Sequence, residues 1–270
     1  MTDSGHAAEQ IDTSKPHPAR MYDYYLGGKD NYQVDVEAAG AVEAAFPTIK
    51  TCARTNRLFM HRATRVLATL GIRQFLDIGT GLPTSPNLHQ VAQAAAPESR
   101  VVYADYDPSV LVHARALLRS SPEGRTAYIQ ADVRDPDSIL DAAVLHETLD
   151  MSRPVALSLN ALLHFVPDED KPYEVVARLV EALPSGSYLV LSHCTPDFAP
   201  EMWKNVVEVY HRGGIPAQVR SKEEVLRFFD GLELIEPGVE VPHRWRPDGP
   251  AQPGVDDATV SFFVGVARKP

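Results

Sequence analysis

From residue 74 onward, short apolar runs alternate with segments whose apolar residues recur at helical spacing. The runs predict strands at 74–78, 100–104, 126–130, 154–159 and 187–192, and the periodic segments predict helices at 87–96, 109–119, 138–149 and 173–183. Strands and helices that alternate in this way form right-handed βαβ units around a parallel sheet. The sequence therefore predicts an α/β fold with a doubly wound, mostly parallel sheet.

The C-terminal part departs from this alternation. Two predicted helices, at 201–211 and 223–229, are followed by strands at 232–241 and 259–267, which a proline-rich loop joins without a helix. Consecutive strands that lack a crossover helix pair antiparallel. We therefore expect a seven-stranded sheet that ends in an antiparallel hairpin.

The N-terminal part is different again. Residues 1–19 are polar and predict a flexible arm, and residues 20–72 predict a cap segment with helices at 35–45 and 51–70. Four of the ten tyrosines fall between residues 20 and 32, beside a Gly-Gly pair. We favour a cap that closes over a ligand, with its functional positions at Arg20, Tyr22, Tyr25, Gly27 and Gly28, the two glycines acting as hinges. The alternative is aromatic packing of this segment onto the domain.

Basic residues mark one side of the helix predicted at 51–70. Arg54, Arg57, Arg62 and Arg65 could bind an anionic substrate or a partner. The more frequent outcome for such residues is a solvated face that pairs with acidic neighbours. Both interpretations stay open.

Composition limits the partners and the location. The 270 residues include 36 acidic and 26 basic side chains, for a formal net charge of -10. This charge disfavours nucleic acid and favours a small molecule. Cys52 and Cys194 form neither a disulfide framework nor a metal site, and no apolar run could span a bilayer or serve as a signal peptide. We expect a cytoplasmic protein without metal or membrane contact; the oligomeric state is not readable.

Polar residues stand at the ends of four predicted strands. The first strand runs into residues 77–81, whose two glycines allow a tight turn and close approach to a ligand. The next two end in Asp105 and Asp132, which can accept hydrogen bonds from ribose hydroxyls and from an adenine amine; the fourth ends in Asn160. An adenosine-containing ligand would explain this set.

Two such cofactors compete, a dinucleotide and S-adenosylmethionine. A dinucleotide site needs a small third residue and a free helix N-terminus for the pyrophosphate, whereas this sequence has Thr84 and then Pro86. Asp77 would also repel a diphosphate but would suit a sulfonium cation that carries an ammonium group. The sequence favours S-adenosylmethionine.

The run at residues 77–81 with Asp105, Asp132 and Asn160 resembles class I S-adenosylmethionine-dependent methyltransferases over about residues 74–270. Residues 18–32, 53–59 and 228–238 are similar to a bacterial family of S-adenosyl methyltransferases formerly classed as a domain of unknown function. The resemblance implies a Rossmann-like domain at 73–270, with S-adenosyl-L-methionine as cofactor and S-adenosyl-L-homocysteine as product. One departure is Leu82, where class I enzymes often have glycine.

The resemblance also implies roles by position. Gly79, Thr80 and Gly81 would line the methionine and ribose, and Asp77 would orient this loop or hold the ammonium group through water. Asn160 would lie near the transferred methyl group. From the residues alone, Asp77 could equally be a buried structural carboxylate.

On the adenosine side, the resemblance assigns Asp105 to the ribose hydroxyls and places Tyr106 beside the adenine. It assigns Asp132 and the Val133 amide to the adenine edge. Asp107 is most simply a helix cap, as is Ser85, because each precedes a proline.

The expected function is methyl transfer to a small-molecule acceptor by in-line displacement, which positioning alone can accelerate. His164 and Tyr25 are weak catalytic candidates, and His193 stands at another strand end, although isolated histidines are usually structural. Two alternatives stay open: a non-catalytic S-adenosylmethionine-binding protein and an NAD(P)-dependent oxidoreductase.

Overall fold

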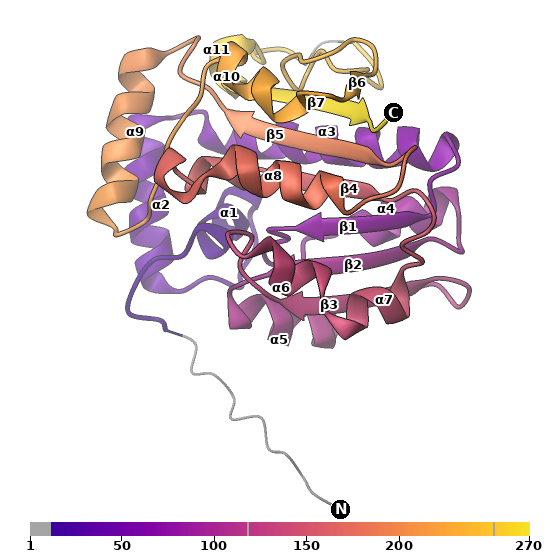
Figure 1. Ribbon diagram of the computed structural model, residues 1–270. Coiled ribbons are helices and arrows are strands. Elements are labelled where there is room, and N and C mark those ends of the chain that lie inside the picture. The colour runs from indigo at the N-terminus through magenta and orange to yellow at the C-terminus, as the bar shows by residue number, and fades with distance from the viewer. Residues whose placement is uncertain (1–11, 118, 251) are drawn as a thin grey trace, which may run out of the picture.

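A computed structural model describes residues 12–117, 119–250 and 252–270 of the chain. Among these residues, seven strands form one sheet in the order β3-β2-β1-β4-β5-β7-β6 (Figure 1). They are β1 (Gln74–Ile78), β2 (Arg100–Asp105), β3 (Arg125–Gln130), β4 (Ala156–Asn160), β5 (Tyr188–Cys194), β6 (Glu233–Leu234) and β7 (Phe262–Arg268). Strands β1 to β5 pair in parallel, and β7 pairs antiparallel with β5 and β6. The predicted α/β fold with its antiparallel C-terminal strand is confirmed.

Helices cover both faces of the sheet. They are α1 (Pro18–Leu26), α2 (Gln33–Ala45), α3 (Ile49–Thr69), α4 (Leu88–Ala95), α5 (Pro108–Leu117), α6 (Pro136–Leu140), α7 (Ala143–Thr148), α8 (Pro172–Glu181), α9 (Pro200–Arg212), α10 (Lys222–Leu226) and α11 (Asp257–Val260), with 3-10 turns η1 (Leu163–Phe165), η2 (Asp168–Asp170) and η3 (Arg227–Phe229). Figure 1 shows α6 and α8 in front of the sheet and α3 and α4 behind it. Along β1, Leu76 and Ile78 join the front core and Phe75 joins the rear core, because successive side chains of a strand point to opposite faces.

A third core lies beyond the carboxyl ends of the parallel strands, where α1, α2 and α9 gather (Figure 1). Met21, Phe46, Trp203 and Phe262 are buried together there. The N-terminal helices therefore share a core with α9 and β7. Central strand β1 lies between β2 and β4, so that Asp77 stands beside Tyr103 on one side and Ser158 on the other.

Two N-terminal expectations need correction. Helix α1 begins at Pro18, with His17 as its N-cap, so the last residues of the predicted arm are ordered elements of the fold. Residues 1–11 of that arm lie outside the described part. The predicted cap at Ser85 is also wrong, because α4 begins after Asn87, whose backbone N–H donates to the side chain of Gln90 in a capping box.

The C-terminal hairpin differs from its prediction. The connection contains a helix, α11, which Asp256 caps by accepting a hydrogen bond from the Thr259 N–H at 2.7 Å. Strand β6 has only two residues, because a turn closed by the Gly238 N–H and the Ile235 carbonyl interrupts the pairing. The predicted helix at 138–149 is likewise two helices, α6 and α7, since the backbone is extended at Ala142.

Candidate functional site

A cavity of about 290 Å³ lies at the carboxyl ends of β1, β2 and β4. Its lining includes all the residues predicted to bind the cofactor: Asp77, Gly79, Thr80, Gly81, Asp105, Tyr106, Asp132, Val133 and Asn160. The carboxyl edge of a doubly wound sheet is where ligands bind in such folds. The structure therefore brings the predicted cofactor residues together; what each binds stays a prediction.

The loop after β1 is fixed by backbone geometry. Gly79 and Gly81 have φ of +71° and +66°, a left-handed conformation that L side chains adopt rarely. A Cβ atom on Gly79 would lie 2.6 Å from a methyl group of Leu162, so a side chain there would require Leu162 to shift. The Gly81 N–H donates to Asp105 Oδ2 at 2.8 Å, which ties the loop to the end of β2.

Asp105 stands at the centre of the polar wall. Its second oxygen accepts the Asp107 N–H at 3.0 Å, and burial raises the pKa of its carboxyl to about 6. Each carboxylate oxygen can accept more than one hydrogen bond, so Asp105 keeps capacity for a ligand hydroxyl. Neighbouring Tyr106 is 48% exposed, and its ring centroid lies 4.8 Å from that of His17. Asp107 caps α5 through the Ser109 N–H, as predicted.

Asp77 is buried beside Ser158, whose side chain hydrogen-bonds to it. Burial raises the pKa of Asp77 to about 7, and the nearby positive charge of Arg57 opposes this shift. The hydroxyl of Ser158 also accepts a bond from the Asn160 Nδ2 at 2.6 Å. Asp77 therefore has a structural partner and also lines the cavity, so both of its proposed roles are compatible with the geometry.

Asp132 and Asn160 differ in how much of their hydrogen-bonding capacity is left for a ligand. Asp132 accepts two hydrogen bonds from Arg134 Nε, at 3.0 and 2.9 Å; burial opposes ionisation, but these bonds outweigh it and lower the pKa of Asp132. In contrast, Asn160 Oδ1 is buried and has no hydrogen-bond partner among the described residues. A buried acceptor without a partner costs free energy, so a ligand donor at this position would be stabilised.

Helix α1 crosses the cavity from one end to the other. At its first turn, Ala19 is the nearest neighbour of a Cβ built on Gly81, at 3.9 Å. Further along, the Tyr22 hydroxyl donates to the Ala53 carbonyl at 3.0 Å and accepts from Asn56 Nδ2 at 3.1 Å. Tyr25 lines the cavity together with Tyr210 of α9. Tyr22 and Tyr25 thus lie on the cavity, as the cap interpretation expects.

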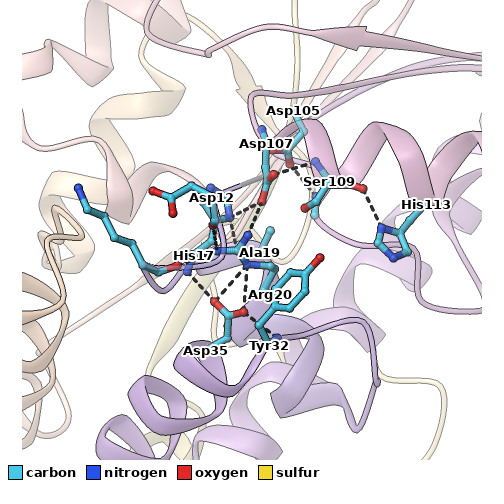
Figure 2. A network of polar contacts seen from close by, with 12 residues as sticks. Asp12, His17, Ala19, Arg20, Tyr32, Asp35, Asp105, Asp107, Ser109 and His113 are labelled. Carbon is cyan, nitrogen blue, oxygen red and sulfur yellow. Dashed lines mark hydrogen bonds and ion pairs between the residues drawn. The ribbon is translucent and has the colours of Figure 1, made fainter. Parts of the chain in front are cut away.

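Arg20, predicted as a functional position of the cap, does not line the cavity. Its buried guanidinium lies 3.0 Å from Asp35 and 3.9 Å from Asp107, and it also donates to the carbonyls of Asp12 and Lys15. Figure 2 shows this network, in which the Asp35 carboxylate also accepts bonds from the backbone N–H groups of His17 and Tyr32. Arg20 therefore anchors the segment that crosses the cavity.

The glycine pair also has a structural explanation. Gly27 ends α1 in a left-handed conformation with φ +84°. A Cβ on Gly28 would lie 1.9 Å from an Asp23 carboxylate oxygen, so only glycine fits there. Neither glycine lines the cavity. These contacts account for the pair without a hinge.

The catalytic candidates are poorly suited to exchange a proton with a substrate at neutral pH. Burial, and then the neighbouring Tyr210, raises the pKa of Tyr25 well above its ordinary value. Burial lowers the pKa of His164 well below its ordinary value, so its imidazole is neutral. His193 bonds to Arg220 at 2.9 Å and to the Cys194 carbonyl at 2.7 Å, and it does not line the cavity. Of the three, His164 alone combines a cavity position with a free Nδ1.

The four arginines of α3 do not form one free face. Arg62 is buried and donates to the carbonyls of Pro242 and Trp245, and Arg65 pairs with exposed Asp248 at 2.5 Å. Arg57 donates to the carbonyls of Thr84 and Pro86. Arg54 is exposed. A shared anionic site on this helix is therefore not supported.

Several cavity residues were not singled out from the sequence, namely His17, Ala19, Asn56, Leu162, Phe165, Trp203 and Val206. Trp203 lies on the apolar face of an amphipathic helix, where a tryptophan ordinarily indicates a core position. Arg57 was expected on an outer face but lines the cavity. The sequence holds one clue to this position: no acidic residue occurs between Pro47 and Leu76, so Arg57 has no carboxylate partner nearby in the chain. In the structure it bonds to backbone carbonyls instead.

Two further kinds of feature are absent from the described ranges. No group of three or more His, Cys, Asp or Glu side chains there could hold a metal ion. No helix within the same ranges is long and apolar enough to cross a membrane.

Comparison with known proteins identifies the family. The model of the S-adenosyl methyltransferase family matches residues 4–270. A DUF574 family protein from Streptomyces avermitilis is 52% identical, with a TM-score of 0.94 over 97% of this chain and 100% of that chain. A proposed methyltransferase from Thermobifida fusca is 39% identical, with a TM-score of 0.89 over 98% and 99% of the two chains.

More distant likeness concerns the fold alone. The structure of TnmH is 17% identical and gives a TM-score of 0.51, covering 96% of this chain and 65% of that chain. No curated protein matches the sequence. The match to the family model spans nearly the whole chain, so this protein belongs to the S-adenosyl methyltransferase family and is an S-adenosylmethionine-dependent methyltransferase.

Proposed function

We propose that the β1–β3 side of the cavity holds S-adenosylmethionine and that the β4–β7 side holds a small-molecule methyl acceptor. The observation that carries this proposal is the pairing of Asp105 with the Gly81 N–H, which sets a carboxylate against a left-handed glycine loop. This arrangement offers acceptors for ribose hydroxyls beside a backbone that a ligand can approach closely. The oxidoreductase and non-catalytic alternatives find no support in the family match.

The residues of this side fit such a cofactor. Gly81 leaves open the space that a side chain would fill. Ionised Asp77 places negative charge beneath the loop, toward a sulfonium and an ammonium group. At the end of β4, next to β1, Asn160 Oδ1 offers the cofactor an acceptor that has no partner among the described residues. Val133 and Tyr106 supply apolar and aromatic surface for the adenine. We assign Asp132 to the adenine amine, in competition with Arg134.

The bound cofactor supplies an electrophilic methyl group. The chain's part is to align the acceptor with that group and to exclude water, which can supply a large share of the rate. Helix α1 covers the cavity for this purpose, held by the buried contact between Arg20 and Asp35. His164 Nδ1 is buried at the cavity without a hydrogen-bond partner among the described residues, but its lowered pKa makes it a weak base, so we assign it no proton-transfer role.

A small molecule suits the enclosed cavity better than a macromolecule, because its walls come from α1, α3, α9 and η1 on several sides. We propose residues 73–270 as the cofactor-binding domain and residues 20–72 as its cap, which shares a core with α9 and β7. The buried thiols of Cys52 and Cys194 support a cytoplasmic location.

Thermal-shift titration tests the cofactor assignment. A ligand at a hundredfold excess over its Kd stabilises by about 2.7 kcal/mol, a shift of roughly 5–10 °C for a domain of this size. We expect this shift with S-adenosylmethionine and S-adenosylhomocysteine but not with NADH. Asp105→Ala should reduce this stabilisation to about 0.4–1.4 kcal/mol at the same ligand concentration, whereas Asp141→Ala, at an exposed carboxylate outside the cavity, should leave it unchanged. A shift with NADH alone would refute the proposal.

A further inference from the structure

The acceptor side of the cavity is lined by apolar and aromatic side chains. They come from elements far apart in the chain, among them Ala53 of α3, Phe165 of η1, Trp203 and Val206 of α9, and Phe262 of β7. Two of these rings already have edge-to-face neighbours: the Trp203 centroid lies 5.5 Å from that of Phe46, which is outside the lining, and the Phe165 centroid lies 5.4 Å from that of Tyr210. A further ring would find the same kind of contact here.

Apart from α1 and α3, the described elements of this side contribute no charged side chain to the lining; α1 contributes Asp23, whose carboxylate already accepts bonds from the Asp30 N–H and Asn31 Nδ2. Of the described residues that η1, α9, the 214–219 segment and β7 contribute to the lining, none is Asp, Glu, Lys or Arg. The cation that α3 contributes to the lining, Arg57, is already bonded to the carbonyls of Thr84 and Pro86. A charged acceptor would therefore lose its hydration without gaining a counterion, which is costly.

A few polar atoms remain available on this side. The Trp203 side chain is only 3% exposed, and its indole N–H has no hydrogen-bond partner among the described residues. Asn56 Oδ1 and His164 Nδ1 are also buried and without partners, and all three residues line the cavity. An indole N–H can only donate, so the group that satisfies it must be an acceptor such as an oxygen.

We propose that the methyl acceptor is an uncharged aromatic small molecule that carries an oxygen, whose ring packs among Phe165, Trp203 and Phe262 and whose oxygen accepts a hydrogen bond from the Trp203 indole. This inference rests on the proposed function, because it assumes that the other side of the cavity is filled by the cofactor. It adds to that function the chemical class of the acceptor.

The charge requirement is tested by calorimetric titration of the whole protein, saturated with S-adenosylhomocysteine. The probes share one ring system: 2-naphthol is neutral, 2-naphthoate is an anion and 2-naphthylmethylammonium is a cation. We expect 2-naphthol to bind at least tenfold more tightly than either ion. Equal or tighter binding of an ion, or no binding of any of the three, would overturn the proposal.

The hydrogen bond is tested by a pair of matched variants. Trp203 and Trp245 are the two tryptophans of the chain, both buried and both with an unpartnered indole N–H, but Trp245 does not line the cavity. Trp203→Phe should weaken 2-naphthol binding about tenfold, the effect of one hydrogen bond and some lost contact. Trp245→Phe should leave it unchanged. Equal affinity in the two variants would contradict the assigned oxygen contact.

Failure of this inference can be told apart from failure of the proposed function. Binding of S-adenosylhomocysteine is titrated first, on wild type and on both variants, which also shows that each variant folds. If it binds while 2-naphthol does not, only the acceptor class is wrong. If S-adenosylhomocysteine does not bind, the cofactor assignment is wrong. The three probes are then titrated without S-adenosylhomocysteine, and their ranking still tests whether the apolar side prefers a neutral ring. Should Trp203→Phe not fold, the ranking of the three probes on wild type decides.

Discussion

The two sides of the cavity are built in contrasting ways. The cofactor side is polar and comes from the ends of three successive strands, with Asp77, Asp105 and Asp132 each at or just beyond a strand end. The acceptor side is apolar and comes from elements spread from α1 to β7, with Trp203 and Phe262 among them. A site for a charged, hydrogen-bonding ligand needs distinctive residue types, whereas a site for an apolar ligand uses the residue types of the core.

Helix α1 joins the two sides, so the strongest test of the contrast is to loosen that helix. Asp35 is fully buried and accepts bonds from Arg20, His17 and Tyr32. Asp35→Ala leaves the Arg20 guanidinium buried without its main counterion, which should cost about 3–5 kcal/mol of unfolding free energy. Binding of S-adenosylhomocysteine and of 2-naphthol should both weaken. Urea unfolding and calorimetry measure these effects.

The control for this prediction is Asp248→Ala, which removes the exposed partner of Arg65. An exposed pair contributes about 0–1 kcal/mol, so this variant should behave like wild type. Loss of only one ligand in Asp35→Ala would show that α1 serves one side of the cavity rather than both.

The pH dependence of stability and of ligand binding should also distinguish the two sides of the cavity. Burial raises the pKa of Asp77 from 3.8 to about 7, so the folded protein holds a proton there that the unfolded chain releases. Stability from this group is therefore complete below about pH 4 and falls as the pH rises to about 7, by an amount of order a few kcal/mol. Asp77→Asn should remove this part of the pH dependence in urea unfolding.

The same titration should affect the ligands differently. Ionised Asp77 attracts a cation, so S-adenosylmethionine should bind more tightly as the pH rises from about 6 to about 8. Binding of 2-naphthol, which stays neutral in that range, should not change. A parallel change for both ligands would contradict the separation of the two sides.

Asp105→Ala is expected to affect the cofactor side alone. Hydrogen bonds to a charged group contribute about 1.5–3 kcal/mol, so S-adenosylhomocysteine binding should weaken by about ten- to a hundredfold. Affinity for 2-naphthol in the absence of S-adenosylhomocysteine should remain at its wild-type value. The comparison uses calorimetry, and Asp105→Asn should lose less than Asp105→Ala because its amide oxygen still accepts.

A smaller effect is expected from Gly79, in the loop after β1, which faces Leu162. Gly71 and Gly79 both have positive φ, but a Cβ on Gly71 meets open space, whereas one on Gly79 meets Leu162. Gly71→Ala should cost about 1–2 kcal/mol for its left-handed backbone. Gly79→Ala should cost more, by the displacement of Leu162, and unfolding curves of the two variants measure the difference. Equal costs would mean that Leu162 moves freely.

The contrast between the polar and the apolar side also explains which features could be predicted from the sequence. Strand β1 has the bounds that its apolar run predicts, and Asp105 and Gly81, both expected at the carboxyl edge of the sheet, are bonded to each other there. Both predictions rest on local signals, namely an apolar run and a glycine turn. The strand predicted at 232–241 exists only as the two residues of β6, because the Gly238 turn interrupts it, and helix α11 was missed because its Asp256 cap lies in a stretch that resembles a loop.

The roles of Arg20 and Trp203 could not be predicted for a different reason, namely that they depend on tertiary packing. Arg20 lies in a tyrosine-rich stretch that suggests ligand contact, yet its role depends on Asp35, whose position follows only from the packing of α1 on α2. Trp203 has the sequence signature of a core residue and has core neighbours on one side. That another side lines a cavity depends on how α1, η1 and α9 meet, which no local pattern encodes.

The path of α1 has a thermodynamic consequence. Its first turn borders the glycine loop and its third turn borders Tyr210, so in the proposed arrangement both ligands would contact this one helix. If binding of one ligand orders the helix, the second ligand binds without the free-energy cost of ordering it. The resulting coupling must be reciprocal: the factor by which S-adenosylhomocysteine changes the affinity for an aromatic acceptor equals the factor by which the acceptor changes the affinity for S-adenosylhomocysteine.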